Sequence, residues 1–279
     1  MKLSIPVMET IQKRHSVRTY ENRPLMPQDR EALLKCMKQL DNPFGVPVHE
    51  YIIDKKLSTE GEKLGTYGVI KGASTFLGVS IPDTELAPLA AGYEFENLIL
   101  FATHMGLGTV WLAATFNRDS FASAMEIPKD ELSPAISPVG YPTAKRSLTE
   151  KLMRSTMKSS SRSQWEELFF QADFSHSVDQ RHGWSLCPTA GDGAAGSFRQ
   201  KRTALAGKTP NAYHFYADYK PGLSKGEKVI KQVDLGIALS HFHQTVLKLG
   251  LAGAFEQMPQ EDANLPENIH YMISWRIAE

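Results

Sequence analysis

The sequence predicts an α+β protein whose single chain forms two sheet-plus-helix halves that pack as a pseudo-dimer. Three observations lead to this prediction. Strand-like segments alternate with helical ones, a basic stretch divides the chain near its middle, and segments of the first half recur faintly in the second. The chain has 279 residues, which is enough for one large hydrophobic core or two modest ones.

Local patterns predict the helices and strands of the first half. Ser4, followed by Pro6, is typical of a helix start, and Pro27 begins a second helix with apolar residues at helical spacing. Apolar runs bounded by turn residues predict strands. The predicted helices cover 4–14, 27–40, 91–105 and 117–127, and the predicted strands cover 49–54, 74–81 and 134–141.

A basic, serine-rich stretch, "TAKRSLTEKLMRSTMKSSSRS" (143–163), separates the two halves. It is nearly free of large apolar residues, which is typical of an exposed connector. We favour a solvated crossover over a basic binding arm, because charged runs usually face water. The predicted organisation is a first half at 1–146, a basic connector at 147–163 and a second half at 164–279.

The second half repeats the first in the order strand, long helix, glycine-rich exit and strand. Each match is weak alone, but the common order predicts a duplicated fold. The matched pairs are "VHEYII" (48–53) with "YHFYAD" (213–218), "GYEFENLILFATH" (92–104) with "GIALSHFHQTVLK" (236–248), "MGLGTVW" (105–111) with "LGLAGAF" (249–255), and "SPAISPVGY" (133–141) with "ENIHYMISW" (267–275).

Composition excludes several classes of function. Lys+Arg and Asp+Glu both total 31, so the chain lacks the positive charge of a nucleic-acid binder. Cys36 and Cys187 are too few for a disulfide framework and are expected to behave as small hydrophobes. The longest apolar stretch (98–116) is interrupted by polar residues and glycines, and no signal-like run precedes Glu9. We therefore expect a cytoplasmic protein without a membrane span.

The segment "IQKRHSVRTY" (11–20) places cationic groups and a hydroxyl where a helix ends. Two guanidinium groups flanking a serine suit the capture of a phosphate or of an anionic ring edge. Alternatively, basic residues at a helix C-terminus offset the helix dipole, which accounts for Arg14 but not for Ser16 and Arg18. The pattern occurs once, because nothing near 164–183 resembles it.

Three stretches, "RHSVRTYENRPL", "GLGTVWLAATF" and "ISPVGYPTAKR", follow one another in the order used by the FMN-dependent nitroreductases, and the sequence resembles that family. The tandem arrangement resembles its internally duplicated branch, the "putative TM nitroreductases". The resemblance covers most of 5–146 and, loosely, the second half. It implies a nitroreductase-like fold, an FMN cofactor, and electron transfer from NAD(P)H to a small acceptor such as a nitroaromatic or a quinone.

The resemblance also implies roles for particular residues. In nitroreductases an arginine–serine motif holds the FMN phosphate and pyrimidine edge, which here implicates Arg14, His15, Ser16 and Arg18. The segment after the long helix passes the flavin, and a backbone N–H reaches flavin N5; the matching residues are Trp111, Leu112, Ala113 and Ala114, with Ala113 or Ala114 as the expected donor. Core packing is the alternative role for Trp111. Basic residues after the last strand complete the phosphate site, and these match Lys145 and Arg146.

In nitroreductase dimers the partner chain adds a Pro-Ser-x-x-Asn-x-Gln-Pro-Trp stretch to the flavin site. Its best match here is "CPTAGDGAAGSF" (187–198), in which Pro188 and Thr189 fit and Asp192 stands near the Asn position. The Gln, Pro and Trp of the pattern are absent. This departure keeps an alternative open, namely a flavin-binding or flavin-sequestering protein without turnover, or a degenerate relative that binds no flavin.

The corresponding stretch of the first half, "LDNPFGVP" (40–47), is expected to face a vestigial second site, so we expect one FMN per chain.

No catalytic side chain and no metal site are predicted; His241 and His243 stand two apart on a predicted helix and cannot ligate one metal together. One of these two histidines is expected to be buried between the halves. The expected partners are NAD(P)H and a small acceptor, with no nucleic acid and no membrane, and the chain is expected to act as a monomer.

Overall fold

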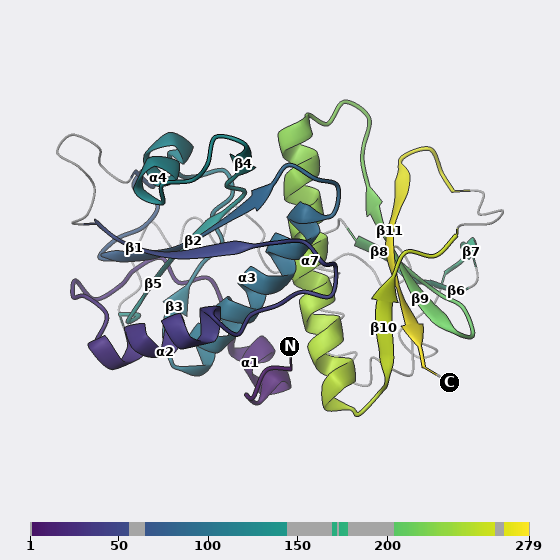
Figure 1. Ribbon diagram of the computed structural model, residues 1–279, viewed down its shortest axis with the longest axis horizontal. Helices are drawn as coiled ribbons and strands as arrows, with labels where there is room; N and C mark the ends of the chain where they lie inside the picture. Colours follow the sequence, from purple (N-terminus) through teal and green to yellow (C-terminus); the bar gives the residue numbers. More distant parts are fainter. Residues whose placement is uncertain are drawn as a thin grey trace.

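The computed structural model describes residues 2–55, 65–143, 169–171, 173–177, 204–259 and 265–278. Two sheets lie on either side of two long helices, α3 (Ala87–His104) and α7 (Lys225–Lys248) (Figure 1). The predicted α+β class is therefore confirmed. The predicted connector at 147–163 lies outside the described residues, so the proposed boundaries between the halves stay predictions.

The first sheet is antiparallel and has β2 in its interior. Strands β1 (His49–Asp54), β2 (Thr75–Pro82), β5 (Ile136–Gly140) and β3 (Gly108–Thr109) follow one another across the sheet, and β4 (Glu131–Leu132) pairs with β2. All residues of β2 before Pro82 are buried, which explains why its sequence is a continuous apolar run. The strands predicted at 49–54, 74–81 and 134–141 are present.

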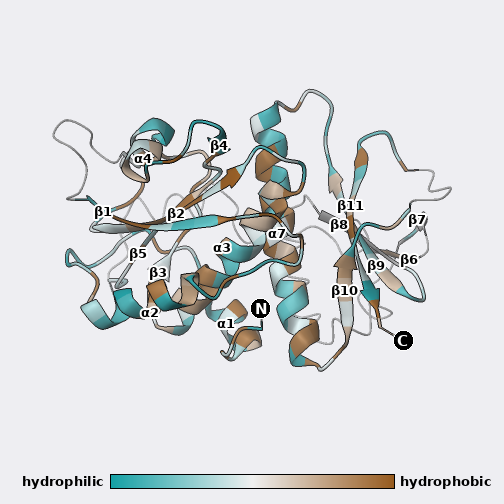
Figure 2. Ribbon diagram, viewed as in Figure 1, coloured by the Kyte–Doolittle hydropathy of each residue, from teal (hydrophilic) through white to brown (hydrophobic). Residues whose placement is uncertain are grey.

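The described part of the first half also contains three shorter helices. Helix α1 (Val7–Lys13) begins after Pro6, later than predicted, because Ser4 does not cap it. Helix α2 (Pro27–Met37) begins at the predicted proline, and its teal and brown segments in Figure 2 fit a helix with one face in the core. Helix α4 (Arg118–Ala124) begins where the Asn117 side chain accepts the N–H of Ser120 at 3.1 Å.

The second sheet lies beyond α7. Its strands run in the order β10 (Gly253–Glu256), β11 (Ile269–Ile277), β9 (Ala212–Asp218), β8 (Ala204–Lys208), β6 (Phe169–Gln171) and β7 (Asp173–Ser177). The β6–β8 pair is parallel and the others are antiparallel. Tyr213, Phe215 and Trp275 from this sheet form one apolar cluster with residues of α7 and of the first turns of α3.

The sheet order corrects one of the sequence matches. Strand β9 precedes the long helix α7 and pairs with β11, just as β2 precedes α3 and pairs with β5. The counterpart of β9 is therefore β2, and matching 48–53 with 213–218 was wrong. Both segments alternate aromatic and polar residues, and such alternation predicts a strand without stating which neighbour it pairs with. The order strand, helix, exit and strand is confirmed.

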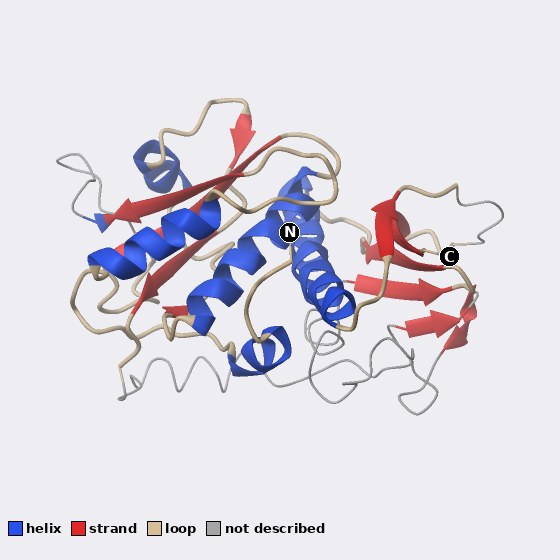
Figure 3. Cartoon of the chain, turned by 60° about the horizontal axis from the view of Figure 1, so that its bottom comes forward, coloured by secondary structure: helices blue, strands red, loops and turns tan. Residues whose placement is uncertain are grey.

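Helices α3 and α7 lie side by side between the two sheets (Figure 3). Helix α3 is buried almost all round, which is unusual for an amphipathic surface helix and typical of a central one. Helix α7 begins at a capping box, in which Ser224 and Glu227 satisfy each other's backbone N–H groups.

The contact between α3 and α7 is reciprocal and passes through two glycines. A Cβ on Gly92 would lie 2.2 Å from the carbonyl oxygen of Val233, and one on Gly236 would lie 2.1 Å from that of Leu89. Gly92 and Gly236 occupy the same place in the matched helix segments, and so do Leu89 and Val233. Such exchange of equivalent contacts is the property of a two-fold interface, which supports the pseudo-dimer.

Polar residues continue this reciprocity one turn further along. Glu96 contacts His241, with Nε2 2.8 Å from Oε1, while Asn97 accepts a hydrogen bond from Ser240 Oγ at 2.9 Å. In the matched helix segments, position 96 corresponds to 240 and position 97 to 241. The contact between 96 and 241 is therefore the counterpart of the contact between 240 and 97. The prediction that one of the two helix histidines is buried between the halves is confirmed, because His241 is 2% exposed.

Candidate functional site

The arginine-rich segment leaves α1 and runs beside the edge strand of the first sheet. Ser16 forms a parallel β-bridge with Thr109, and the N–H of Val17 donates to the Thr109 carbonyl at 2.9 Å. Gly108 makes room for this approach, since a Cβ there would lie 2.8 Å from Cγ1 of Val17. The fold therefore brings two stretches from the sequence, 14–18 and 108–111, side by side.

The four predicted residues of this segment differ in exposure. The Arg14 side chain is 20% exposed and points its Nε toward Glu96, at 3.7 Å from Oε1. His15 is exposed, and its Nδ1 lies 2.9 Å from the carbonyl of Lys13. Ser16 and Arg18 are partly buried. The segment thus presents two guanidinium groups of reduced solvent access beside a hydroxyl.

The predicted segment 111–114 follows directly from β3. Trp111 is partly buried and meets the ring of Phe95 edge to face, with centroids 4.9 Å apart. Leu112 is buried and exchanges two backbone hydrogen bonds with Ile136, of 2.9 and 3.0 Å. Among the hydrogen bonds of the described residues, none uses the N–H of Ala113 or Ala114.

Glu96 connects these two segments, and it is a functional candidate that the sequence analysis did not single out. Its carboxylate is 1% exposed and accepts the indole N–H of Trp111 at 2.7 Å through Oε2. Oε1 faces His241 and Arg14. Burial alone would raise the pKa of Glu96, but the hydrogen bonds and charges of His241, Arg14 and Trp111 outweigh it and lower the pKa. The available signal was the presence of two glutamates, Glu94 and Glu96, in a helix that is otherwise mostly apolar.

The first-half stretch at 40–47 contacts the second half, and its role at a vestigial second site stays a prediction. The Phe44 ring lies 5.5 Å from Tyr93 and 5.5 Å from Phe255, and Phe255 stands at the position matched with Trp111. His243 also packs against Phe255, with its Nδ1 2.6 Å from the Tyr93 hydroxyl. The place equivalent to the Trp111 region is thus occupied by aromatic side chains.

The remaining predicted residues lie outside the described part of the chain. These are Lys145, Arg146, Pro188, Thr189 and Asp192. Their roles stay predictions, as does the closing of the site by segment 187–198. Within the described residues, no helix is long and apolar enough to cross a membrane, and no three metal-binding side chains gather.

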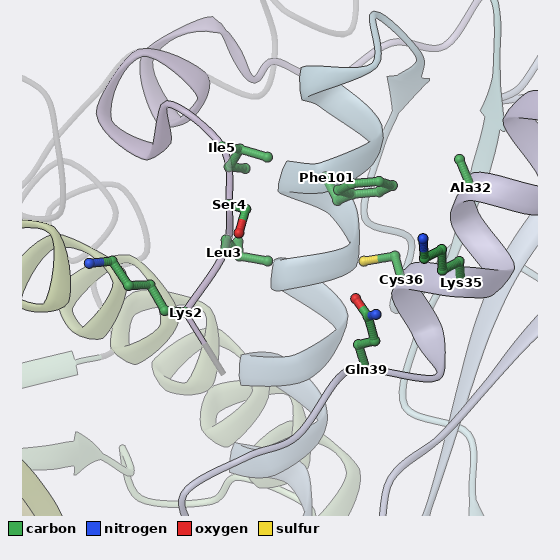
Figure 4. A pocket seen from close by; sticks show the side chains of 9 residues that line it. All are labelled: Lys2, Leu3, Ser4, Ile5, Ala32, Lys35, Cys36, Gln39 and Phe101. Atoms are coloured by element: carbon green, nitrogen blue, oxygen red, sulfur yellow. The ribbon is translucent and has the colours of Figure 1, made fainter.

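A cavity of about 260 Å³ lies elsewhere, between the N-terminal segment, α2 and α3 (Figure 4). Lys2, Lys35 and Phe101 are among its lining residues, and none of the predicted flavin residues is. Cys36 also lines it, but burial, aided by the charge of Glu50, raises the pKa of this thiol to about 12. The thiol is therefore protonated at neutral pH and a poor nucleophile, in agreement with the expectation from the sequence.

The family model described as "Putative TM nitroreductase" matches residues 6–246. The chain belongs to this family. The resemblance found in the motifs is thereby confirmed, since the match includes the whole first sheet and the strands β6 to β9 of the second. No curated protein sequence matches this TM nitroreductase-family chain significantly.

One solved structure shows the same fold over nearly the whole chain, and two others match about half of it. A "putative nitroreductase" from Thermotoga maritima is 15% identical, with a TM-score of 0.59 over 99% of this chain and 96% of that one. A "putative NADH dehydrogenase/NAD(P)H nitroreductase" from Parabacteroides distasonis is 27% identical, with a TM-score of 0.42 over 50% of this chain and 89% of that one. An "FMN-dependent nitroreductase" from Clostridium difficile is 15% identical, with a TM-score of 0.40, and the match covers 49% and 88% of the two chains.

Proposed function

We propose that this TM nitroreductase-family protein is an FMN-dependent oxidoreductase that passes electrons from NAD(P)H to a small acceptor such as a nitroaromatic or a quinone. The observation that carries the proposal is the side-by-side position of the Arg14–Arg18 segment and the strand that leads to Trp111. These are the two stretches through which the sequence resembles nitroreductases, and they come from places far apart in the chain.

The residues present fit an anionic, planar cofactor. Arg14 and Arg18 are partly buried, and a guanidinium with limited access to water binds phosphate or an anionic ring edge more strongly than an exposed one. The N–H groups of Ala113 and Ala114 are not used by other described groups, so both can donate to a ring nitrogen. Lys145 and Arg146 are proposed to add charge at the phosphate.

When bound, FMN supplies the hydride and electron transfer. The chain's own residues bind and orient it. Arg14 and Arg18 would hold the anionic edge of the cofactor and favour negative charge there, and the segment 111–114 would lie against its ring. No side-chain acid or base is needed for this role, in keeping with the absence of a predicted catalytic side chain.

An absorbance spectrum followed by one activity measurement tests the proposal. We expect purified protein to be yellow, or to become so with added FMN, and to oxidise NAD(P)H in the presence of a nitroaromatic acceptor. Yellow protein without turnover would instead support the flavin-binding or flavin-sequestering alternative. Protein that stays colourless and cannot be reconstituted with FMN would contradict the proposal and indicate a degenerate relative.

A further inference from the structure

The carboxylate of Glu96 is almost completely buried where α3 packs against α7. A buried carboxylate is costly unless charged or hydrogen-bonding partners surround it. Here the partners are His241 Nε2 at 2.8 Å, Trp111 Nε1 at 2.7 Å and Arg14 Nε at 3.7 Å. These three groups belong to three separate segments of the chain, and His241 and Trp111 lie within hydrogen-bond distance while Arg14 forms an ion pair.

The two carboxylate oxygens of Glu96 face different partners. Oε2 takes the indole N–H of Trp111, whereas Oε1 faces both His241 and Arg14. One rigid group therefore contacts both proposed flavin-binding segments at once. Arg and Trp side chains are otherwise free to change rotamer, and fixing them before a ligand arrives lowers the entropy cost of binding.

His241 completes the arrangement from the second half of the chain. It is 2% exposed and stands on α7, and its Nε2 contacts the same carboxylate oxygen, Oε1, that Arg14 faces. The second half thus affects the proposed site through a residue of the first half.

We propose that Glu96 is a positioning residue, whose carboxylate, paired with His241, holds Arg14 and Trp111 in the orientation that binds FMN. This inference rests on the proposed function. Glu96 does not itself touch the cofactor in this arrangement. The lowered pKa of Glu96 is consistent with a carboxylate that stays ionised at neutral pH and accepts hydrogen bonds on both oxygens.

Glu96→Gln tests the proposal, because an amide of nearly the same shape has only one oxygen. Its single oxygen can face either Trp111 or the pair of His241 and Arg14, but not both. We expect the apoprotein to bind FMN about ten-fold more weakly, as is typical when the group that orients a ligand-binding residue is removed. The dissociation constant is measured by the quenching of FMN fluorescence.

Glu94→Gln is the matched control. Glu94 stands two residues earlier on α3 and is 4% exposed, but its described partners are Asn42 and Glu50. We expect this variant to bind FMN as tightly as the wild type. If Glu96→Gln does not fold, Glu96→Asp applies the same test, since its shorter side chain keeps the charge but reaches only one side. Unchanged FMN affinity in the folded Glu96 variant would overturn the proposal.

A double-mutant cycle separates positioning from a general loss of stability. Trp111→Phe removes the indole N–H, so combining it with Glu96→Gln should weaken FMN binding by less than the product of the two single effects. Multiplicative effects would show that Glu96 acts independently of Trp111 and would overturn the inference alone. A wild-type protein that binds no FMN would overturn the proposed function and this inference with it.

Discussion

Two buried carboxylates on α3, Glu94 and Glu96, have opposite electrostatic surroundings. Glu96 is surrounded by donors, whereas Glu94 shares a hydrogen bond with the carboxyl of Glu50. Burial, together with the charge of Glu94, raises the pKa of Glu50 to about 9, and burial also raises the pKa of Glu94. At neutral pH the Glu50–Glu94 pair therefore keeps a proton, which an exposed carboxyl would release.

This pair predicts that stability falls as pH rises. The folded chain holds the Glu50 proton up to a pKa of about 9, whereas the unfolded chain releases it near the ordinary glutamate pKa of 4.5. The free energy of unfolding should therefore decrease between these values, by at most about 1.4 kcal/mol per pH unit for one proton. Glu50→Gln should reduce this slope and be more stable than the wild type at about pH 8.

Urea denaturation of both proteins across this pH range measures the slope. Glu31→Gln, an exposed change on α2, serves as the control and should keep the wild-type slope. Equal slopes for Glu50→Gln and the wild type would show that the two carboxyls do not share a proton.

Arg18 gives a prediction for cofactor binding. Arg18→Ala removes the proposed charge-assisted contact to FMN, and such a contact is worth about 1.5–3 kcal/mol. The affinity for FMN should therefore fall by about one to two orders of magnitude, at about 1.4 kcal/mol per decade, while the apoprotein keeps its thermal stability. Titration with FMN and thermal denaturation of the apoprotein provide the two measurements.

Arg30→Ala is a suitable control for Arg18→Ala. Arg30 stands on α2 and pairs with Asp54 of β1 at 2.9 Å, outside the proposed site. It should leave FMN affinity unchanged. Arg18 would prove structural, and our assignment wrong, if its replacement unfolded the apoprotein without weakening FMN binding.

At the scale of elements, the close approach of α3 and α7 depends on Gly92 and Gly236. Each glycine faces a backbone carbonyl of the opposite helix, and a backbone cannot move aside as a side chain can. The approach in turn brings Glu96 within reach of His241. Glycine normally weakens a helix interior, so its presence in both central helices marks a packing requirement.

Gly236→Ala should therefore destabilise the protein. Overpacking at a rigid contact costs about 1–3 kcal/mol, which exceeds the gain in helix propensity of about 1 kcal/mol. Gly226→Ala, on the same helix with no atom near the added Cβ, should be neutral or stabilising. Chemical denaturation compares the two; a Gly236→Ala protein as stable as Gly226→Ala would mean that the helices can separate without cost.

Local patterns predicted most elements of the first half, because each depends on nearby residues. Pro27 and Asn117 marked helix starts correctly, since a proline or a cap acts within one turn. The match of 48–53 with 213–218 failed for the opposite reason. Strand pairing is decided by contacts between distant segments, and only the sheet order shows that β8 and β9 correspond to β1 and β2.

The same distinction applies to the candidate site. Arg14, Ser16 and Arg18 could be selected from their chemistry and spacing and from the family resemblance. Glu96 and His241 could not, because their meeting requires the register at which α3 crosses α7. That register is set by the reciprocal glycine contacts and is not visible in either helix alone.

At the scale of the whole molecule, we predict at most one FMN per chain. The arginine–serine segment occurs once, and Phe44 packs against Phe255 where the second half would need an open equivalent of the Trp111 region. Flavin released by heat, quantified against protein, gives the stoichiometry. Two flavins per chain would contradict the division into one working and one vestigial site.

The reciprocal contacts between α3 and α7 determine how the sequences of the two halves can diverge. In a dimer of identical chains every contact across the two-fold axis occurs twice, so a glutamate–histidine pair would have an identical twin. Here one crossing pair is Glu96 with His241 and the other is Asn97 with Ser240. Because the two halves belong to one chain, a substitution in one half does not have to be repeated in the other. One half can therefore keep cationic side chains that suit an anionic ligand, while aromatic rings occupy the equivalent place in the other half.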